Sequence, residues 1–143
     1  MAMRFGTVAG LVVAAFAAGV YTGGGAGARA QGTGRVFELR TYTAAEGKLQ
    51  TLSDRFRDRT LTIFKKHGMQ AVGVWIPTDA PHSANTLVFL MEWPSREEAD
   101  KTWQRFGEDP AWKALVVETE KDGRLWTKLD RLWMRPTEYS PMK

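Results

Sequence analysis

The sequence contains no cysteine and only two histidines, His67 and His82. Without cysteine the chain has no disulfide framework and no thiolate chemistry, so its stability must come from a hydrophobic core. Neither histidine has a partner at the spacing of a metal site. We therefore expect neither a metal nor a cofactor. The sequence also lacks a glycine-rich phosphate loop, a Gly-x-Ser-x-Gly elbow and the spacing of a catalytic triad, so no enzyme motif is recognisable.

Long hydrophobic runs are also missing, because the apolar stretch at residues 8–20 is shorter than the roughly 20 residues of a membrane-spanning helix. This stretch follows Arg4 and precedes Ala28-Arg29-Ala30, which fits the Ala-x-Ala pattern cut by signal peptidase. The order is typical of a secretory signal. Residues 1–30 are therefore predicted to be cleaved after Ala30, leaving a periplasmic or secreted protein without membrane attachment. An uncleaved signal anchor is the alternative.

The net positive charge is small once the signal is removed. The chain has 20 basic and 16 acidic residues and a net charge of +4. Cleavage after Ala30 removes Arg4 and Arg29, which lowers that charge to +2. Nucleic-acid binding requires Lys and Arg clustered on one face, so this small excess predicts no nucleic-acid partner.

The remaining chain has the length of one domain with one core. Residues 31–35 are expected to form a flexible lead-in, and the domain is expected to occupy residues 36–141. Hydrophobic periodicity predicts strand 36–42, helix 49–67, strand 69–76, strand 87–93, a helix after Ser95, helix 110–119 and strand 125–134. This β-α-β-β-α-β order predicts an α+β, ferredoxin-like domain, with a four-stranded antiparallel sheet and helices on one face.

Capping residues support the helix assignments. Ser95 with Glu98 three residues later forms a capping box, and Asp109 before Pro110 is a typical helix start. In the first helix, apolar residues share one face while charged residues such as Arg55 and Asp58 fill the other. We therefore expect Arg55 on the outside of the domain.

Apolar residues occupy both faces of the predicted sheet. In strand 87–93, Phe89 and Met91 point to one face while Val88 and Leu90 point to the other. Because the helices cover only one face, a monomer would expose a contiguous apolar patch, which soluble proteins rarely tolerate. A second copy related by a two-fold axis is the simplest cover, so the pattern predicts a homodimer through the sheet face.

Polar side chains on a face that is otherwise buried are the candidates for a binding site. If Phe37 and Leu39 of the first strand pack on the helices, then Glu38, Arg40 and Tyr42 point into the space between the two sheets of the dimer.

Two residues of neighbouring strands complete this expected site, Trp75 near the end of strand 69–76 and Glu92 on strand 87–93. In a binding or catalytic cavity, Arg40 would fix an anionic group and Glu38 or Glu92 would act as a base. The structural alternative is that Arg40 and a glutamate simply pair with each other across the dimer, because buried charges require partners.

Several short motifs resemble those of the NIPSNAP-domain family and follow one another in the same order. They are VFELRTY at residues 36–42 (similar to the family's opening YELRTY strand), residues 47–49 and 66–68 at the two ends of the first helix, Met-Glu-Trp at 91–93, Asp-Pro-Ala-Trp at 109–112 and Pro-Thr-Glu-Tyr-Ser-Pro at 136–141. Together they span residues 36–141, nearly the whole predicted domain.

The resemblance implies a dimeric α/β barrel, in which two ferredoxin-like sheets close into one barrel. It implies little about chemistry, since family members are mostly of unknown activity. Proteins that share the barrel include cofactor-independent monooxygenases and haem-handling enzymes, and these activities enter only as analogy. The predicted export signal separates this chain from the family's better-known intracellular members.

Three functions are compatible with the sequence. A domain that binds a small molecule or a partner without turnover ranks first, because no catalytic constellation stands out. A small-molecule enzyme, such as a cofactor-independent monooxygenase or isomerase, ranks second. A haem-binding protein ranks third, with His67 as its axial ligand, although a histidine in the last turn of a helix is more typical of a cation that complements the helix dipole.

Overall fold

The computed structural model describes residues 34–142, so the predicted signal at 1–30 and most of the lead-in lie outside the described residues. In chain order the elements are β1 (Val36–Ala44), α1 (Leu49–Arg55), the π-helical η1 (Phe56–Thr60), α2 (Leu61–Lys66), β2 (Gln70–Trp75), the 3₁₀ turn η2 (His82–Ala84), β3 (Thr86–Trp93), α3 (Arg96–Glu108), α4 (Pro110–Thr119) and β4 (Trp126–Met134). None of the described helices is long and apolar enough to cross a bilayer.

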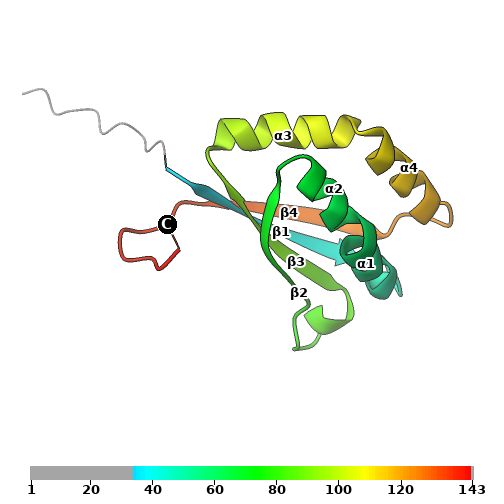
Figure 1. Ribbon diagram of the computed structural model, residues 1–143. Coiled ribbons are helices and arrows are strands. Elements are labelled where there is room, and N and C mark those ends of the chain that lie inside the picture. Colours follow the sequence, from blue (N-terminus) through cyan, green and yellow to red (C-terminus); the bar gives the residue numbers. More distant parts are fainter. Residues whose placement is uncertain (1–33, 143) are drawn as a thin grey trace, which may run out of the picture. The chain divides into compact units, whose positions relative to one another are not determined.

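The four strands form one antiparallel sheet in the order β2-β3-β1-β4. Helices α1 to α4 lie on one side of this sheet (Figure 1). The predicted α+β, ferredoxin-like class is therefore confirmed. Each predicted strand and helix is present, and its ends differ from the prediction by at most two residues.

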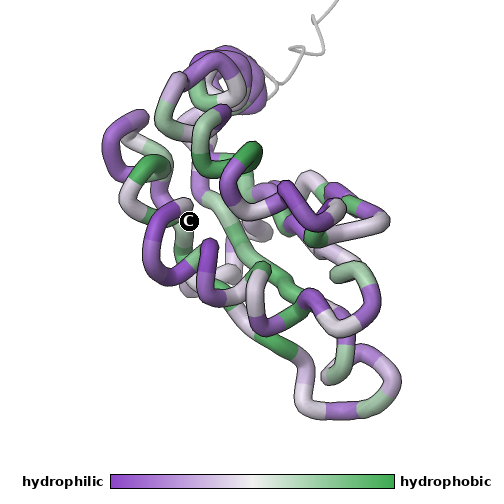
Figure 2. Tube along the Cα trace, turned by 90° about the vertical axis from the view of Figure 1, so that its right-hand side faces the viewer, coloured by the Kyte–Doolittle hydropathy of each residue, from purple (hydrophilic) through white to green (hydrophobic). Residues whose placement is uncertain are grey.

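The core lies between the sheet and the helices. Strand β3 contributes Leu87, Phe89, Met91 and Trp93, which share one face, as the sequence predicted, and are all buried. The ring of Phe56 from the first helical region meets that of Phe89 with 4.9 Å between centroids. Figure 2 shows the hydrophobic segments concentrated in the strands at the centre of the domain. The helices are therefore held mainly by the apolar faces that they turn toward β3 and β1.

The first helical region contains a π-helical turn that the sequence pattern does not reveal. The elements α1, η1 and α2 follow one another without a break, but η1 (Phe56–Thr60) has π-helical hydrogen bonding. A π turn accommodates an extra residue within an α-helix and is frequent at functional sites. In this helix Phe56, Thr60 and Phe64 are all buried against the sheet.

The helix ends carry the caps that the sequence predicted. The Ser95 hydroxyl accepts a hydrogen bond from the backbone N–H of Glu98 at 3.1 Å. The Asp109 carboxylate accepts one from the backbone N–H of Ala111 at 2.7 Å. Gly68 has φ +69°, a conformation that glycine adopts without steric cost, and it ends α2.

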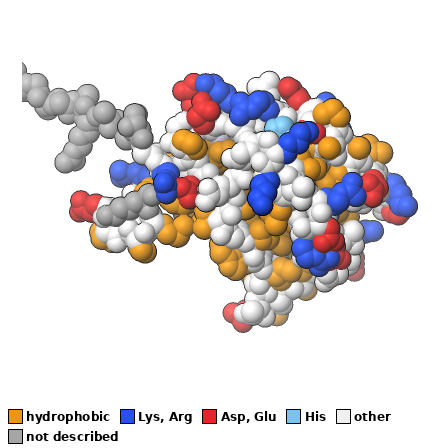
Figure 3. All heavy atoms as spheres, in the orientation of Figure 1, with side chains coloured by type: hydrophobic (Ala, Val, Ile, Leu, Met, Phe, Trp, Pro, Cys, Tyr) orange, Lys and Arg blue, Asp and Glu red, His pale blue; other side chains and the backbone are white. Residues whose placement is uncertain are grey.

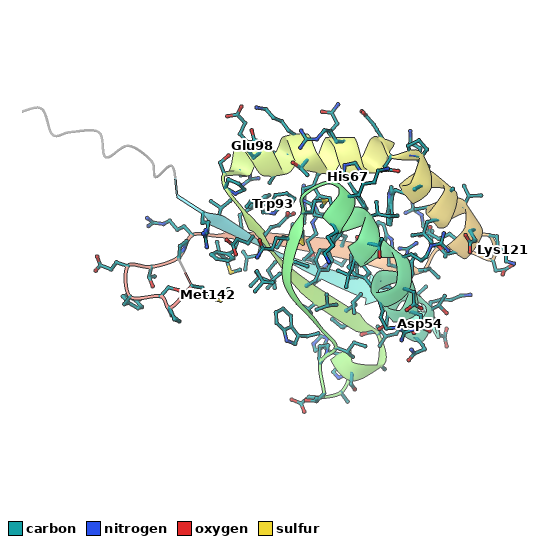
Figure 4. All side chains as sticks on the ribbon, in the orientation of Figure 1. Asp54, His67, Trp93, Glu98, Lys121 and Met142 are labelled. Carbon is teal, nitrogen blue, oxygen red and sulfur yellow. The ribbon has the colours of Figure 1, made fainter. Side chains whose placement is uncertain are left out.

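The second face of the sheet, which we call the open face, carries no helix (Figure 1). The C-terminal tail folds back over one end of it, so that Met134, Pro136 and Met142 surround a hollow together with Phe37 and Leu90. Figure 4 shows Met142 in this tail, away from the helices. Phe37, which was expected to pack on the helices, is therefore buried by the tail on the opposite face.

Beyond the tail, the open face exposes apolar side chains. Leu132 is 57% exposed and Trp75 is 51% exposed. In Figure 3 hydrophobic side chains gather along the lower side of the domain, where Figure 1 has the sheet. The apolar character that the sequence predicted for this face is therefore present.

Candidate functional site

The side chains of Glu38, Arg40 and Tyr42 face the helices, so the predicted orientation of β1 was wrong. The register pairs Glu38 with Met91 and Arg40 with Phe89, and directly paired residues share a face of the sheet. Because that face of β3 is the core, all three residues are buried. The charged residues are tolerated in the core because they neutralise each other.

The other two predicted site residues lie on the open face, away from the first three. Glu92 forms an ion pair with Arg35, with 2.8 Å between Oε1 and Nη1. The ring of Trp75 folds over Gly73, whose missing side chain leaves room for it. The structure therefore separates the predicted site into two groups, and Glu92 is not placed to act on a group held by Arg40.

A cavity of about 250 Å³ lies between the sheet and the helices of the single chain. Its walls are formed by Arg40, Tyr42, Phe56, Thr60, Phe64, Trp103, Phe106 and Trp112. Six of these eight residues are aromatic, and Arg40 is the charged one. Sites for drug-sized ligands usually measure ~300–1,000 Å³, so this cavity suits a molecule with one or two rings.

A wider groove of about 790 Å³ runs along the surface between α2 and β2. The polar residues that line it, Thr62, Lys65 and Gln70, are all exposed to solvent. Specific binding sites combine apolar walls with polar groups that are shielded from water. The smaller cavity is therefore the better candidate for a binding site.

The carboxylate of Glu38 is completely buried and hydrogen-bonded through both oxygens. Oε1 accepts a bond from Arg40 Nε at 2.6 Å, while Oε2 accepts bonds from the indole N–H groups of Trp103 at 2.7 Å and Trp93 at 3.2 Å. Figure 4 shows Trp93 between the sheet and α3. With both oxygens engaged, Glu38 is placed to orient Arg40 rather than to act as a base.

The guanidinium of Arg40 is fixed on two sides. Its Cζ lies 3.5 Å from the ring centroid of Trp103, a stacked cation–π arrangement. Its Nε is bonded to Glu38 within the same strand, where the sequence-based alternative had placed the pair between two copies. The guanidinium also hydrogen-bonds the hydroxyl of Tyr42, and the donors that remain on its Nη atoms are the ones that could serve the cavity that Arg40 lines.

The phenol of Tyr42 lies beside Arg40 in the cavity wall. Burial raises the pKa of Tyr42 above its ordinary value of 10.0, although the positive charges of Arg40 and Arg55 act in the opposite direction. Its ring stacks on Phe89 with 5.8 Å between centroids. At neutral pH the hydroxyl is therefore protonated and held in place as a potential donor.

Thr60, in the π-helical turn, brings an unpaired polar atom to the cavity. The residue is 1% exposed, it lines the cavity, and its Oγ1 has no hydrogen-bond partner. Burying an unpaired hydroxyl costs ~1–3 kcal/mol, so this atom in the cavity wall is a group with which a bound molecule or a water can pair. Sequence reasoning missed Thr60, because threonine on a helix face carries no signal of its own.

We expect Thr60→Val to raise the free energy of unfolding of the free protein by about 1 kcal/mol, because valine removes the unpaired hydroxyl and keeps the branched shape. Urea unfolding at neutral pH measures the change. Thr62→Val, on the exposed side of the same helix, is the matched control and should leave the stability unchanged. A loss of stability in Thr60→Val would mean that the hydroxyl makes a stabilising bond.

Arg55 is buried, which corrects the expectation that it lies on the outer face of the first helix. Its Nη1 lies 3.0 Å from Glu120 Oε1 and 3.1 Å from Thr119 Oγ1. Its Cζ is 5.4 Å from the ring centroid of Trp112, a wall of the cavity. Arg55 thus ties α1, at its junction with the π turn, to the end of α4, and it supports the cavity from behind.

Asp109 joins the end of α2 to the junction of α3 and α4. Its Oδ2 lies 2.8 Å from Lys66 Nζ and 2.6 Å from His67 Nε2. Figure 4 shows His67 at the end of α2, facing α3. Because this ring nitrogen is engaged and His67 does not line the cavity, the residues do not fit haem with His67 as its axial ligand. Within residues 34–142 no three His, Asp or Glu side chains group as a metal site would require.

The Asp109 contacts give the stability a defined pH dependence. Hydrogen bonds from Lys66 and then His67 hold the pKa of Asp109 well below its ordinary value of 3.8. A carboxyl group whose pKa is lower in the folded than in the unfolded state stabilises the fold above the unfolded value. That stabilisation is lost as the pH falls through 3.8 toward the folded value.

We therefore expect the free energy of unfolding to fall more steeply below about pH 4 in the natural protein than in Asp109→Asn, whose amide oxygen can still cap α4. Urea unfolding at about pH 7, 4 and 3 compares the two. An equal loss on the acid side in both proteins would contradict the assignment.

Comparison with known proteins agrees with the fold. The family model of the NIPSNAP domain matches residues 37–141. The chain matches none of the curated proteins. It is similar in structure to a NIPSNAP family protein of Agrobacterium tumefaciens, with 19% identity, a TM-score of 0.67, and 76% of this chain and 99% of that chain covered.

A similar structure is an uncharacterised NIPSNAP-like domain protein of Burkholderia xenovorans, with 16% identity, a TM-score of 0.67, and 77% and 91% coverage of the two chains. Another is a monooxygenase of Streptomyces coelicolor in complex with nanaomycin D, with 14% identity, a TM-score of 0.54, and 78% and 95% coverage. At these identities the likeness shows the fold alone. The family match, however, covers almost the whole described domain, and the chain therefore belongs to the NIPSNAP family.

Proposed function

We propose that this protein binds a small aromatic molecule in the cavity between the sheet and the helices. The observation that carries the proposal is the Thr60 hydroxyl, which is buried, unpaired and part of the cavity wall. Aromatic side chains such as Phe64 and Trp103 offer surfaces on which a flat molecule can stack. This site lies within one chain, and not between two sheets as we expected from the sequence.

Calorimetric titration of the full chain with 2-naphthoate and with 2-naphthamide tests the proposal, because these two-ring compounds match the size of the cavity. We expect at least one of them to bind and Thr60→Phe, which places a ring in the cavity, to abolish that binding. Thr62→Phe, on the solvent side of the same helix, should leave it intact. If neither compound binds, or if Thr60→Phe binds as well as the natural protein, the proposal fails.

A small-molecule enzyme is the second candidate. It is favoured by the likeness of the fold to the monooxygenase that binds nanaomycin D, and by the phenol of Tyr42 beside the guanidinium of Arg40 in one cavity. Such donors could stabilise negative charge that develops on an oxygen atom. An oxygen electrode tests this candidate with any compound that binds. Oxygen consumption no faster than that of the Thr60→Phe variant would argue for binding without oxygenation.

We also propose that a second copy of the chain covers the open face. Leu132 and Trp75 are more than half exposed on a sheet face that carries no helix, and an apolar face of this kind is suited to an interface. The tail covers only the end near Phe37. Sedimentation equilibrium should give the mass of a dimer for the natural protein and that of a monomer for Leu132→Arg. A monomer in both cases would contradict the proposal.

Export remains a proposal that rests on the pattern of residues 1–30. The mature protein recovered from the host should begin at Gln31, which mass spectrometry of the intact protein can establish. A full-length mass in the cytoplasmic fraction would contradict export.

A further inference from the structure

We infer that the ligand is a planar aromatic carboxylate, held by the Nη atoms of Arg40 and by the hydroxyl of Thr60. The inference rests on the proposed function, since it names the class of molecule that the same cavity takes. Three properties of the site support it: the balance of donors and acceptors, the fixed orientation of the guanidinium, and the aromatic walls.

Hydrogen-bond donors outnumber acceptors in the cavity wall. Arg40 has five N–H donors; the Nε group is engaged with Glu38 and one further donor with the Tyr42 hydroxyl, which leaves the others for a ligand. Thr60 adds an unpaired hydroxyl, and Tyr42 adds a phenol that is protonated at neutral pH. None of the eight lining residues is acidic. A ligand that supplies acceptors, and no further donors, would satisfy this wall.

The carboxylate of Glu38 does not compete for the ligand's place. It lies behind Arg40, on the Nε side of the guanidinium. Its other oxygen is occupied by the indole N–H groups of Trp93 and Trp103, which offset its negative charge. Glu38 therefore occupies the Nε group, and the Nη groups are the part of Arg40 that we expect a ligand in the cavity to meet.

The guanidinium is held in the plane that a carboxylate requires. One face of the guanidinium is covered by Trp103 and its Nε group is bonded to Glu38, so we expect a ligand to approach its outer edge. A guanidinium edge with two parallel N–H groups matches the two oxygens of a carboxylate. This bidentate interaction is strongest when the guanidinium is already held in the required orientation. A neutral amide of the same shape would instead place an N–H group against the arginine.

The remaining walls favour a flat hydrocarbon body on that carboxylate. Phe56, Phe64, Phe106 and Trp112 surround the polar groups, and the volume of about 250 Å³ leaves room for one or two rings. Aromatic pairs are favourable in offset-stacked and edge-to-face arrangements, which these walls can offer from several directions. An aliphatic acid would fill the same space without these contacts.

The test compares 2-naphthoate with 2-naphthamide in calorimetric titrations of the full chain. We expect the acid to bind about 10-fold or more tightly than the amide, the difference typical of a hydrogen-bonded charged group. In Thr60→Val, which keeps the fold, the acid should bind about 10-fold more weakly than in the natural protein. In Glu38→Gln/Arg40→Gln, which removes both buried charges together, the preference for the acid should disappear.

The outcomes separate the inference from the proposed function. If acid and amide bind equally well in the natural protein, the inference is overturned while the cavity remains a binding site. A preference for the acid that survives both variants also overturns it, because the carboxylate would then lie elsewhere. If neither compound binds, the proposed function itself fails.

Discussion

Glu38→Ala is expected to lower the free energy of unfolding by about 3–5 kcal/mol, the loss typical of breaking a buried ion pair from one side. The carboxylate is 0% exposed, and its removal leaves the Arg40 guanidinium and two indole N–H groups without their acceptor. Because Trp93 and Trp103 donate directly to Glu38, their fluorescence should also change in the folded variant. Urea unfolding followed by tryptophan fluorescence measures both effects.

Two variants make this result specific. Glu97→Ala removes an exposed glutamate from α3 and should leave the stability unchanged. Glu38→Gln/Arg40→Gln removes both charges and should cost less than Glu38→Ala, because no unpaired charge remains in the core. If the double variant is less stable than Glu38→Ala, the loss of stability in Glu38→Ala is not caused by breaking the ion pair.

A loss of about 3 kcal/mol is expected from Glu120→Ala. This change leaves the guanidinium of Arg55, whose side chain is 2% exposed, without its carboxylate. The Nε of Arg55 already lacks a partner, and the remaining contacts with the Thr119 hydroxyl and the Trp112 ring carry no negative charge. The same unfolding experiment measures the effect, and a weaker binding of 2-naphthoate should accompany it because Arg55 supports the Trp112 wall.

Glu118→Ala is the matched control, since Glu118 lies on the same helix and pairs with Arg59 at 3.6 Å while both are exposed. It should leave the stability unchanged. In a double-mutant cycle, Arg55→Met combined with Glu120→Ala should be more stable than the sum of the single losses predicts. Additive losses would mean that the two residues stabilise the domain independently.

The order of elements was predictable because their signals are local. Ser95 and Asp109 mark helix starts through bonds to N–H groups two or three residues away, and Gly68 ends a helix through its own backbone angle. The alternation of Phe89 and Met91 with Val88 and Leu90 depends only on the geometry of a strand. Such features do not depend on contacts with distant parts of the chain.

The direction of the β1 side chains was not predictable in the same way. Alternation divides β1 into two sets, but it does not say which set faces the helices. Phe37 is apolar and yet lies on the open face, because the C-terminal tail covers it there. Glu38 and Arg40 are charged and yet face the core, because Trp103 contacts both from α3. These contacts join residues that are more than 60 positions apart in the sequence, which no local pattern contains.

Thr60 and Arg55 were missed for a related reason. Thr60 lies four residues from both Phe56 and Phe64 and is buried with them, but threonine occurs on buried and exposed helix faces alike. Arg55 looked like a solvent-exposed cation because its partner, Glu120, lies at the end of a different helix. The sequence alone does not distinguish a buried arginine or threonine from an exposed one, so their roles become visible only in the folded structure.

The π turn makes the number of residues in this helix as important as their identity. Because a π turn absorbs one extra residue, deleting one residue between positions 56 and 60 would restore ordinary α-helical winding while α1 and α2 keep their places. Lys66 and His67 would then stay beside Asp109, and the change would be confined to the turn that carries Thr60 into the cavity wall. Relatives one residue shorter here should therefore keep the fold but differ in the molecule they bind.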